Sequence, residues 1–149
     1  MVWHDVDASS STTHDVRLAA MSTNPSASPY DSWSSVLTVN QGGHSILPGV
    51  DVDPSSGNAF VSYYWFPANG SAYANYGMSV SFNTSGAPVF VANNAITSRW
   101  GDIQYYTTDA GGNRYLGDYH DVAYVNGHFL CAHILVLATG NPWAFIVTP

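Results

Sequence analysis

The chain has 149 residues, enough for one domain with a hydrophobic core, and its length does not require a second domain. Its ten acidic residues are all Asp and its three basic residues are all Arg, so Glu and Lys, the usual residues of exposed helix surfaces, are absent. A net charge of −7 without Lys argues against a nucleic-acid or anionic-membrane surface, and the abundance of Ser, Thr, Asn, Gly, Tyr and Val favours an all-β fold.

Alternating apolar and polar residues, bounded by turn residues, predict about ten short strands. Tight turns are expected between them at segments such as 54–57 and at Asn126-Gly127. No apolar stretch approaches the roughly 20 residues of a membrane span, so no spanning segment is expected. In chain order the predicted strands are 2–5, 16–22, 35–39, 45–52, 59–66, 77–82, 89–93, 120–125, 128–135 and 143–148.

Two segments, 46–65 and 116–133, correspond to each other about 70 positions apart, and each reads as strand, tight Gly turn, strand. The strands that follow also correspond, since Met21 leads toward Trp33 as Val80 leads toward Phe90. Repeats of this size are typical of stacked arrays such as propeller blades. With blade strands labelled A to D from the axis outward, the chain would run B, C and D of one blade, all four strands of a second, and A, B and C of a third.

The segment Leu47 to Gly57 resembles the inner strand and hairpin of the six-bladed sialidase-like β-propeller superfamily, whose outer hairpins carry an Asp-box (BNR repeat). Segment 81–86 is similar to that box with Asn83 in the Asp position, and Ser22 begins a second degenerate copy. The step 117–119 (Gly-Asp-Tyr) also occurs in secreted members of the superfamily. The resemblance implies one partial propeller of two and a half to three four-stranded antiparallel blades, with blade limits at 1–43, 44–97 and 98–149.

Retaining sialidases of that superfamily use three Arg, a Tyr nucleophile paired with Glu, and an Asp acid/base. This chain has no Glu to activate a Tyr, so no catalytic residue is assigned. The six His do not follow zinc-site spacing. The pairs Asp5/Asp7 and Asp51/Asp53 lack the Gly and the bidentate acid of a calcium loop, so turn capping is the simpler explanation for them. We expect no metal and no cofactor.

Asp118, His120 and Asp121 form the densest cluster of reactive groups, at the start of a predicted inner strand. In a propeller this position lies at the mouth of the central channel, where ligands commonly bind, so we predict a ligand site there. The alternative is that both Asp bond local backbone amides and that His120 only packs in the channel. Aromatic residues such as Tyr63, Tyr64 and Trp65 would allow the ligand to be a glycan, although in a β-sheet protein most are expected to be core or cross-strand partners.

The leading hypothesis is a non-enzymatic secreted propeller segment, extracellular or at the cell surface, that serves binding or assembly. It would act through self-association, completion by further blades or carbohydrate binding, because incomplete outer blades expose strand edges. The acceptor sequences at Asn69 and Asn83 predict glycosylation. Cys131, inside an apolar run, is expected to be buried. The alternative is a fragment of a secreted sialidase-like glycoside hydrolase whose catalytic residues lie on missing blades.

Overall fold

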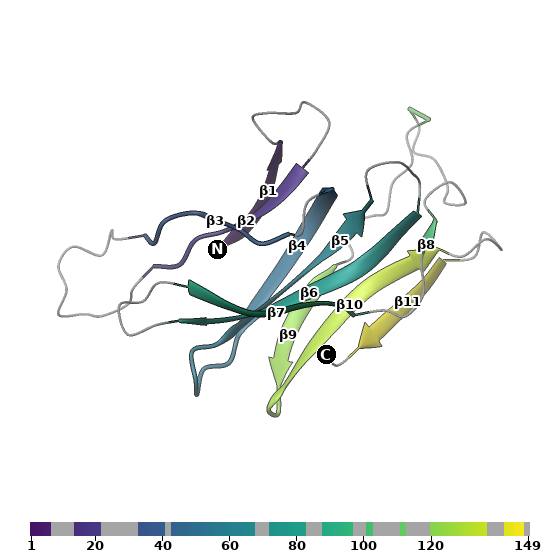
Figure 1. The fold of residues 1–149 in the computed structure, drawn as a ribbon. Helices are drawn as coiled ribbons and strands as arrows, with labels where there is room; N and C mark the ends of the chain where they lie inside the picture. Colours follow the sequence, from purple (N-terminus) through teal and green to yellow (C-terminus); the bar gives the residue numbers. More distant parts are fainter. Residues whose placement is uncertain are drawn as a thin grey trace.

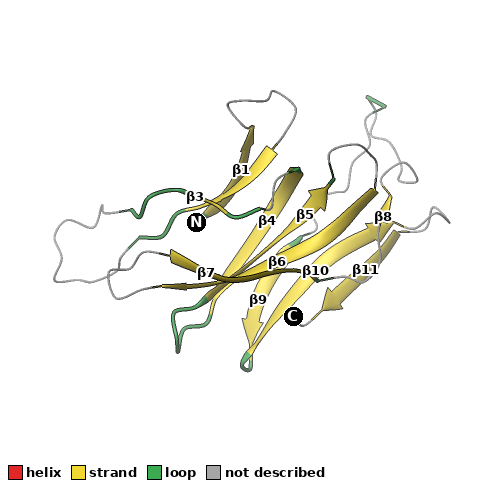
Figure 2. Ribbon diagram, in the orientation of Figure 1, coloured by secondary structure: helices red, strands yellow, loops and turns green. Residues whose placement is uncertain are grey.

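Ten segments of the chain are described by the computed structural model: residues 1–6, 14–21, 33–40, 43–67, 72–82, 88–96, 101–102, 111–112, 120–136 and 142–147. All regular secondary structure in these segments is strand, which confirms the all-β prediction (Figure 1, Figure 2). The same segments contain no helix long and apolar enough to cross a membrane.

Every predicted strand has a counterpart in the structure. The strands are β1 (Val2–Val6), β2 (His14–Leu18), β3 (Leu37–Thr38), β4 (His44–Val52), β5 (Ala59–Phe66), β6 (Ala72–Phe82), β7 (Pro88–Ala95), β8 (Gly101–Asp102), β9 (Asp121–Val125), β10 (His128–Val136) and β11 (Pro142–Val147).

Most strand ends differ from the prediction by one to three residues, and three strands differ more. β2 ends at Leu18 rather than at residue 22, although Met21 still forms an isolated bridge with Trp33. β6 begins five residues earlier than predicted, because its first half is buried on both faces and shows no apolar–polar alternation. β8 was not predicted; two residues carry too little pattern to be recognised.

The strands form three antiparallel sheets, in which neighbours follow chain order except that β8 pairs with β6 in the middle sheet. The first sheet is β1-β2-β3, the middle sheet is β4-β5-β6-β7 and the third sheet is β9-β10-β11, with the middle sheet between the other two (Figure 1). No sheet closes on itself within the described residues. The blade arrangement therefore remains a prediction, as do the blade limits; β8, from the range predicted for the last blade, pairs with β6 of the middle sheet.

The corresponding residues of the sequence repeat occupy corresponding places in the structure. Met21 pairs with Trp33 across the first sheet, and Val80 pairs with Phe90 across the middle sheet. The repeated hairpins are β4–β5 and β9–β10, and in both turns a glycine, Gly57 or Gly127, has a positive φ. The repeat is therefore structural as well as sequential.

The middle sheet carries a hydrophobic core on both faces, because the side chains of β5 point alternately toward the first and the third sheet. The core against the first sheet contains Val16, Leu18, Val39, Ala59, Val61, Tyr63, Met78 and Val80. The core against the third sheet contains Tyr64, Phe66, Tyr73, Ile134, Leu135 and Val136, with a smaller group of Phe60, Val122 and Cys131 beside it. Cys131 is buried, as predicted.

The two repeated hairpins are closed by different turns. In the β4–β5 turn, Asp53 accepts hydrogen bonds from the backbone amide and hydroxyl of Ser55, at 2.8 and 2.6 Å, and from the hydroxyl of Ser56 at 2.6 Å. These bonds hold the pKa of Asp53 below its usual range, and the bond from the Ser55 hydroxyl has the largest effect. In the β9–β10 turn, Asn126 and Gly127 have φ of 50° and 87°, as a type I′ turn requires.

Candidate functional site

The candidate site lies at the β4–β9 interface, where the first strand of the middle sheet meets the first strand of the third sheet. Gly49 of β4 faces β9 so closely that a Cβ atom there would lie 3.3 Å from both Asp121 Cα and Val122 N. Only a glycine allows this approach without displacement of a backbone, so the sequence at Gly49 sets the distance between the two sheets.

Asp51 joins the two sheets through its carboxylate. Its Oδ1 accepts a hydrogen bond from the amide of Val52 at 2.8 Å, and its Oδ2 accepts one from the amide of Tyr124 in β9 at 2.6 Å. Asp121, at the corresponding place in the repeat, makes the same local bond, with Oδ1 2.8 Å from the amide of Val122. Asp121 is exposed, and no described residue reaches its second oxygen.

Leu47 connects the middle sheet to both of its neighbours. It lies in a bulge of β4 between Ile46 and Gly49 and has a φ of 50°, which is unusual for a residue with a side chain. Its amide donates a hydrogen bond to Nδ1 of His4 in β1 at 3.3 Å, and its carbonyl accepts one from Nδ1 of His120. The bulge thus directs one peptide unit toward the first sheet and the next toward the third.

His120 uses both ring nitrogens for bonds inside the protein. Because a carbonyl oxygen can only accept, Nδ1 carries the hydrogen toward Leu47, and Nε2 then accepts from the hydroxyl of Ser62 in β5 at 2.8 Å. The ring packs against Tyr64 with a centroid distance of 4.9 Å. Burial lowers the pKa of His120, while the Leu47 carbonyl and Asp121 act in the opposite direction.

Two further ionisable side chains, both from β10, lie near His120 and Ser62. His133 is 2 % exposed, and burial, with a smaller effect of His120, lowers its pKa from 6.5 to about 4. Cys131 is fully buried, and burial raises the pKa of its thiol to about 11 against the opposing effect of a hydrogen bond with Ser62. Both groups are therefore neutral at pH 7, and Cys131 is not a reactive thiolate.

Two buried tyrosines of the middle sheet bond the backbone of β10 beyond the end of β9, which pairs with β10 only as far as Ala132. Tyr64 accepts a hydrogen bond from the amide of Ile134 at 2.7 Å. Tyr73 accepts one from the amide of Val136 at 2.8 Å and donates one to the carbonyl of Ile134 at 3.2 Å. The two hydroxyls thereby satisfy polar groups that would otherwise be buried without partners.

The structure places two of the three predicted ligand-binding residues at this interface. His120 packs and bonds internally and Asp121 bonds a local amide, which are the contacts of the alternative interpretation; a ligand-binding role for them remains a prediction. Asp118 lies outside the described residues, as do the predicted glycosylation sites Asn69 and Asn83.

Sequence reasoning missed the partners of these residues at the interface. Ser62, which bonds His120, precedes it by 58 positions in the chain. Tyr124, whose amide bonds Asp51, follows it by 73 positions. The one available signal was the repeat itself. It aligns Asp51 with Asp121 and so indicates that the two residues have the same structural role.

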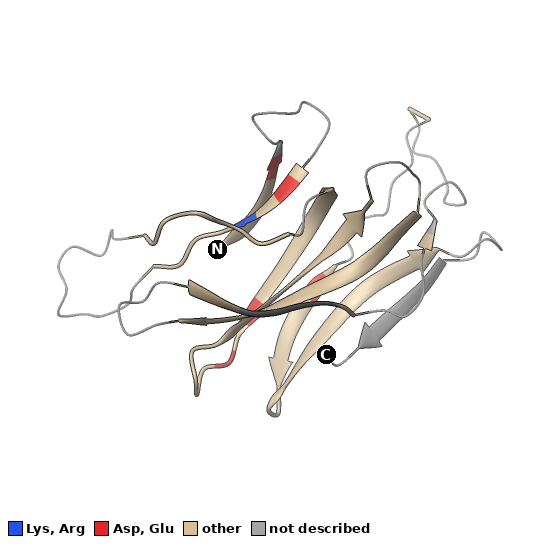
Figure 3. Ribbon diagram, in the orientation of Figure 1, with Lys and Arg blue, Asp and Glu red and all other residues tan. Residues whose placement is uncertain are grey.

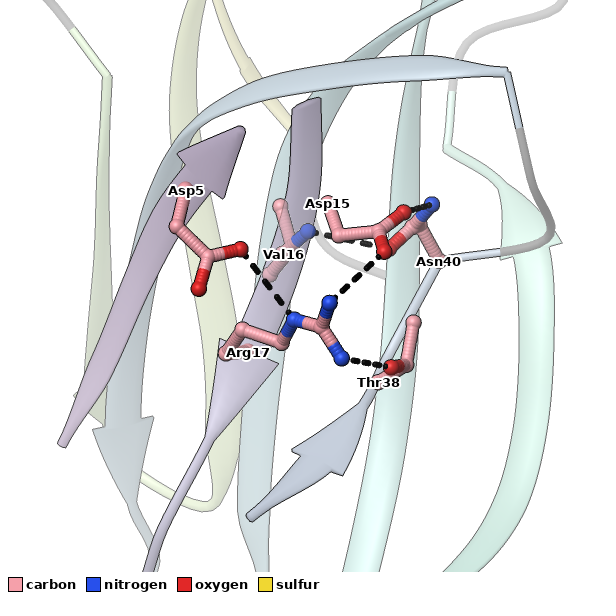
Figure 4. A network of polar contacts seen from close by, with 6 residues as sticks. All are labelled: Asp5, Asp15, Val16, Arg17, Thr38 and Asn40. Atoms are coloured by element: carbon pink, nitrogen blue, oxygen red, sulfur yellow. Dashed lines mark hydrogen bonds and ion pairs between the residues drawn. The ribbon is translucent and has the colours of Figure 1, made fainter. Parts of the chain in front are cut away.

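Charged groups are few in the described part of the chain, where Arg17 is the sole basic side chain (Figure 3). It lies on the outer face of the first sheet and donates to Asp5 at 3.2 Å, to Asp15 at 3.0 Å and to the hydroxyl of Thr38 (Figure 4). Asn40 extends this network by donating to Asp15 at 3.0 Å and accepting from the amide of Val16 at 2.9 Å. Arg17 is thus committed to the first sheet and does not face the β4–β9 interface.

Arg99 and Arg114 lie outside the described residues, so the structure does not place the other two arginines. Within the described segments, no group of three or more His, Cys, Asp or Glu side chains is placed to hold a metal ion.

A scan against protein-family models and searches of curated proteins and of solved structures found no match to this chain. The sialidase-like resemblance therefore remains a prediction from the sequence motifs.

Proposed function

We propose that the chain is a non-enzymatic, secreted β-propeller segment that serves assembly, and that a further sheet, supplied by a second copy, stacks on its third sheet. The proposal rests on one observation, which is that each sheet is covered by the sheet that follows it in the chain. Three meander sheets follow one another in chain order, and the first strand of the middle sheet contacts the first strand of the third.

The face of the middle sheet toward the third sheet is covered. Phe60 packs against Val122 and Cys131, the hydroxyl of Ser62 bonds His120, and Oδ2 of Asp51 accepts the amide of Tyr124. The next copy of the repeat, about 70 positions later, places Leu130, Ala132 and Asp121 where the middle sheet has Phe60, Ser62 and Asp51.

The part of the equivalent face of the third sheet that lies over β9 and the start of β10 has no such cover among the described residues, whereas Ile134 and Val136 farther along β10 are buried. Asp121 pairs with Ala132 and Ala123 with Leu130, so these four side chains lie on the face opposite Val122 and Cys131. Asp121, Ala123 and Ala132 are exposed, and Val125 of the same face is 43 % exposed. An apolar sheet face with an available carboxylate oxygen at its end is suited to a further sheet that donates a backbone amide.

The sheet edges also support association. Phe90 and Val89 of β7, the outermost strand of the middle sheet, are 40 % and 46 % exposed, and Trp33 and Val36 beside β3 are 47 % and 54 % exposed. Lys is one of the residues that commonly protect natural edge strands, and this chain has none. Unprotected edges with large apolar side chains favour addition of another chain.

Size-exclusion chromatography with light scattering on the purified chain tests the proposal. We expect a mass above the 16.0 kDa of the single chain that increases with protein concentration. A Lys at Ala132 places a charge on the uncovered face, so Ala132→Lys is expected to shift the mass toward the monomer.

The matched control is Val52→Lys, because Val52 is also exposed, at 45 %, but lies at the tip of the β4–β5 hairpin. It should associate as the parent chain does. A stable, well-folded monomer at every concentration contradicts the proposal, and so does equal behaviour of the two Lys variants.

A further inference from the structure

Five of the six histidines lie at the two interfaces between the sheets. His4, His14 and His44 form a row of rings beside the first and middle sheets, with His4 at its exposed end, and His120 and His133 lie between the middle and third sheets. The sixth, His128, is exposed beside the β9–β10 turn. Histidine is the side chain whose charge changes between pH 5 and 8, so its position at both interfaces bears on how the sheets respond to acid.

Two contacts here are made by neutral imidazoles, namely that of His4 Nδ1 with the Leu47 amide and that of His120 Nε2 with the Ser62 hydroxyl. Nδ1 of His4 accepts the Leu47 amide, so protonation there would set one N–H donor against another. Nε2 of His120 accepts the hydroxyl of Ser62, and protonation would reverse that bond and place a cation against Tyr64 in a largely buried position. Neither contact survives protonation in its present form.

The neighbouring rings add to the cost of protonation on the first-sheet side. His4 and His14 stack in parallel with centroids 5.7 Å apart and an interplanar angle of 8°, and His14 and His44 are 4.5 Å apart. His44 packs in turn on Phe66 at 5.6 Å. Charges on two adjacent rings would repel one another at these distances.

We propose that His4, Leu47 and His120 form a proton-sensitive clasp, which holds the first and third sheets to the middle sheet near neutral pH and loosens in mildly acidic solution. Leu47 is the shared element, because a single bulge supplies both the amide for His4 and the carbonyl for His120. The inference does not depend on the proposed assembly.

Charged and titratable groups face the clasp from each neighbouring strand. On the first-sheet side these are His14 of β2 and His44 of β4. Asp5 of β1, which favours protonation of His4, lies with Asp15 and Arg17 on the opposite face of the first sheet. On the third-sheet side they are Asp51 of β4, Tyr64 of β5, Asp121 of β9, and Cys131 and His133 of β10. For His4 and His120 burial is the largest effect and lowers the pKa despite Asp5 and Asp121.

The sign of the pH dependence follows from these directions. A histidine whose pKa is lower in the folded than in the unfolded chain binds more protons when unfolded, so stability is full above about pH 6.5 and decreases as the pH falls below it. His133, with a pKa of about 4, alone would raise the unfolding constant by roughly a hundredfold between pH 7.5 and 4. The chain has no Glu and no Lys, so histidines and the terminal amine dominate titration above about pH 5, below which the ten Asp also begin to bind protons.

Two measurements on the parent chain are needed, a reference and a test of the clasp. Chemical denaturation followed by tryptophan fluorescence at several pH values between 7.5 and 4.5 gives the reference, because His133 alone should raise the unfolding constant by more than tenfold toward acid. Hydrogen exchange of the Leu47 amide, corrected for the intrinsic effect of pH, should show more frequent opening over the same range. Protection of this amide that does not change with pH would overturn the proposal.

The variant His4→Asn/His120→Asn isolates the contribution of the clasp. Asparagine places an amide oxygen or nitrogen near the position of Nδ1 and does not titrate, so the rise toward acid should be smaller than in the parent, while His128→Asn should match the parent. An equal slope in the double variant and in His128→Asn refutes the clasp. Should the double variant not fold, NMR titration of the parent decides: values for His4 or His120 at or above 6.5 also refute it.

Discussion

Replacement of Tyr73 by Phe removes one buried oxygen atom from the contact between the middle and third sheets. The hydroxyl accepts the amide of Val136 at 2.8 Å and donates to the carbonyl of Ile134 at 3.2 Å, and both Tyr73 and Val136 are 0 % exposed. The phenyl ring of the variant keeps the packing of Tyr73 against Tyr64 and Phe66, whose centroids lie 5.5 and 5.4 Å away. The substitution therefore changes hydrogen bonding and leaves the core filled.

The cost follows from the groups left behind. A buried N–H without a partner costs about 1–3 kcal/mol, so we expect the free energy of unfolding to decrease by about 2 kcal/mol. For a chain of this size each kcal/mol lowers Tm by about 2–4 °C, which gives a decrease of about 4–8 °C. Urea denaturation and thermal unfolding followed by circular dichroism measure both quantities.

The control for this prediction is Tyr76→Phe. Tyr76 also packs against aromatic rings, those of Tyr63 and Trp65, but its hydroxyl has no hydrogen bond within the described residues. We expect Tyr76→Phe to change stability by less than about 0.5 kcal/mol. If both variants lose the same amount, the hydroxyl of Tyr73 does not hold β10 to the middle sheet and the reasoning is wrong.

Two further predictions concern the core. Gly77→Ala should destabilise the fold by about 1–3 kcal/mol in urea denaturation, because its Cβ would lie 2.2 Å from Phe60 Cζ and 2.9 Å from Ile96 Cδ1. Ser79→Ala on the same strand is the control. An equal effect of both substitutions would contradict the steric explanation. Cys131 should not react with a thiol reagent at pH 8 until the chain is unfolded, because the thiol is fully buried with a pKa of about 11; fast reaction of the folded chain would show that the β4–β9 interface opens.

Strand positions could be predicted from the sequence because most strands show a pattern of apolar, polar and turn residues that are near one another in the chain. β9 shows alternating burial, and it is joined to β10 by Asn126-Gly127, which specifies a tight hairpin turn. The first half of β6 was missed because both of its faces are buried, and burial on both faces depends on neighbours that the local pattern does not contain.

The candidate site could be predicted only in part. The density of reactive side chains singled out the neighbourhood of His120 and Asp121, but it did not reveal that Ser62 and Leu47 bond the two ring nitrogens of His120. Nor did it reveal that Leu47, an ordinary residue in an apolar run, adopts a positive φ and bonds two different sheets. A bulge is a response to tertiary packing, and no local residue preference for Leu predicts it.

The sequence by itself determined the all-β class, the hairpins and the repeat, because side-chain alternation and turn chemistry act between residues that are near in the chain. Tertiary structure alone decided which faces are covered, which backbone groups the tyrosine hydroxyls satisfy and which histidines are kept neutral. Those properties depend on contacts between sheets, such as that of Asp51 with Tyr124, whose partners are far apart in sequence and meet only when the sheets stack. Burial and electrostatics are set by that stacking, and the pKa values of His120 and His133 follow from it.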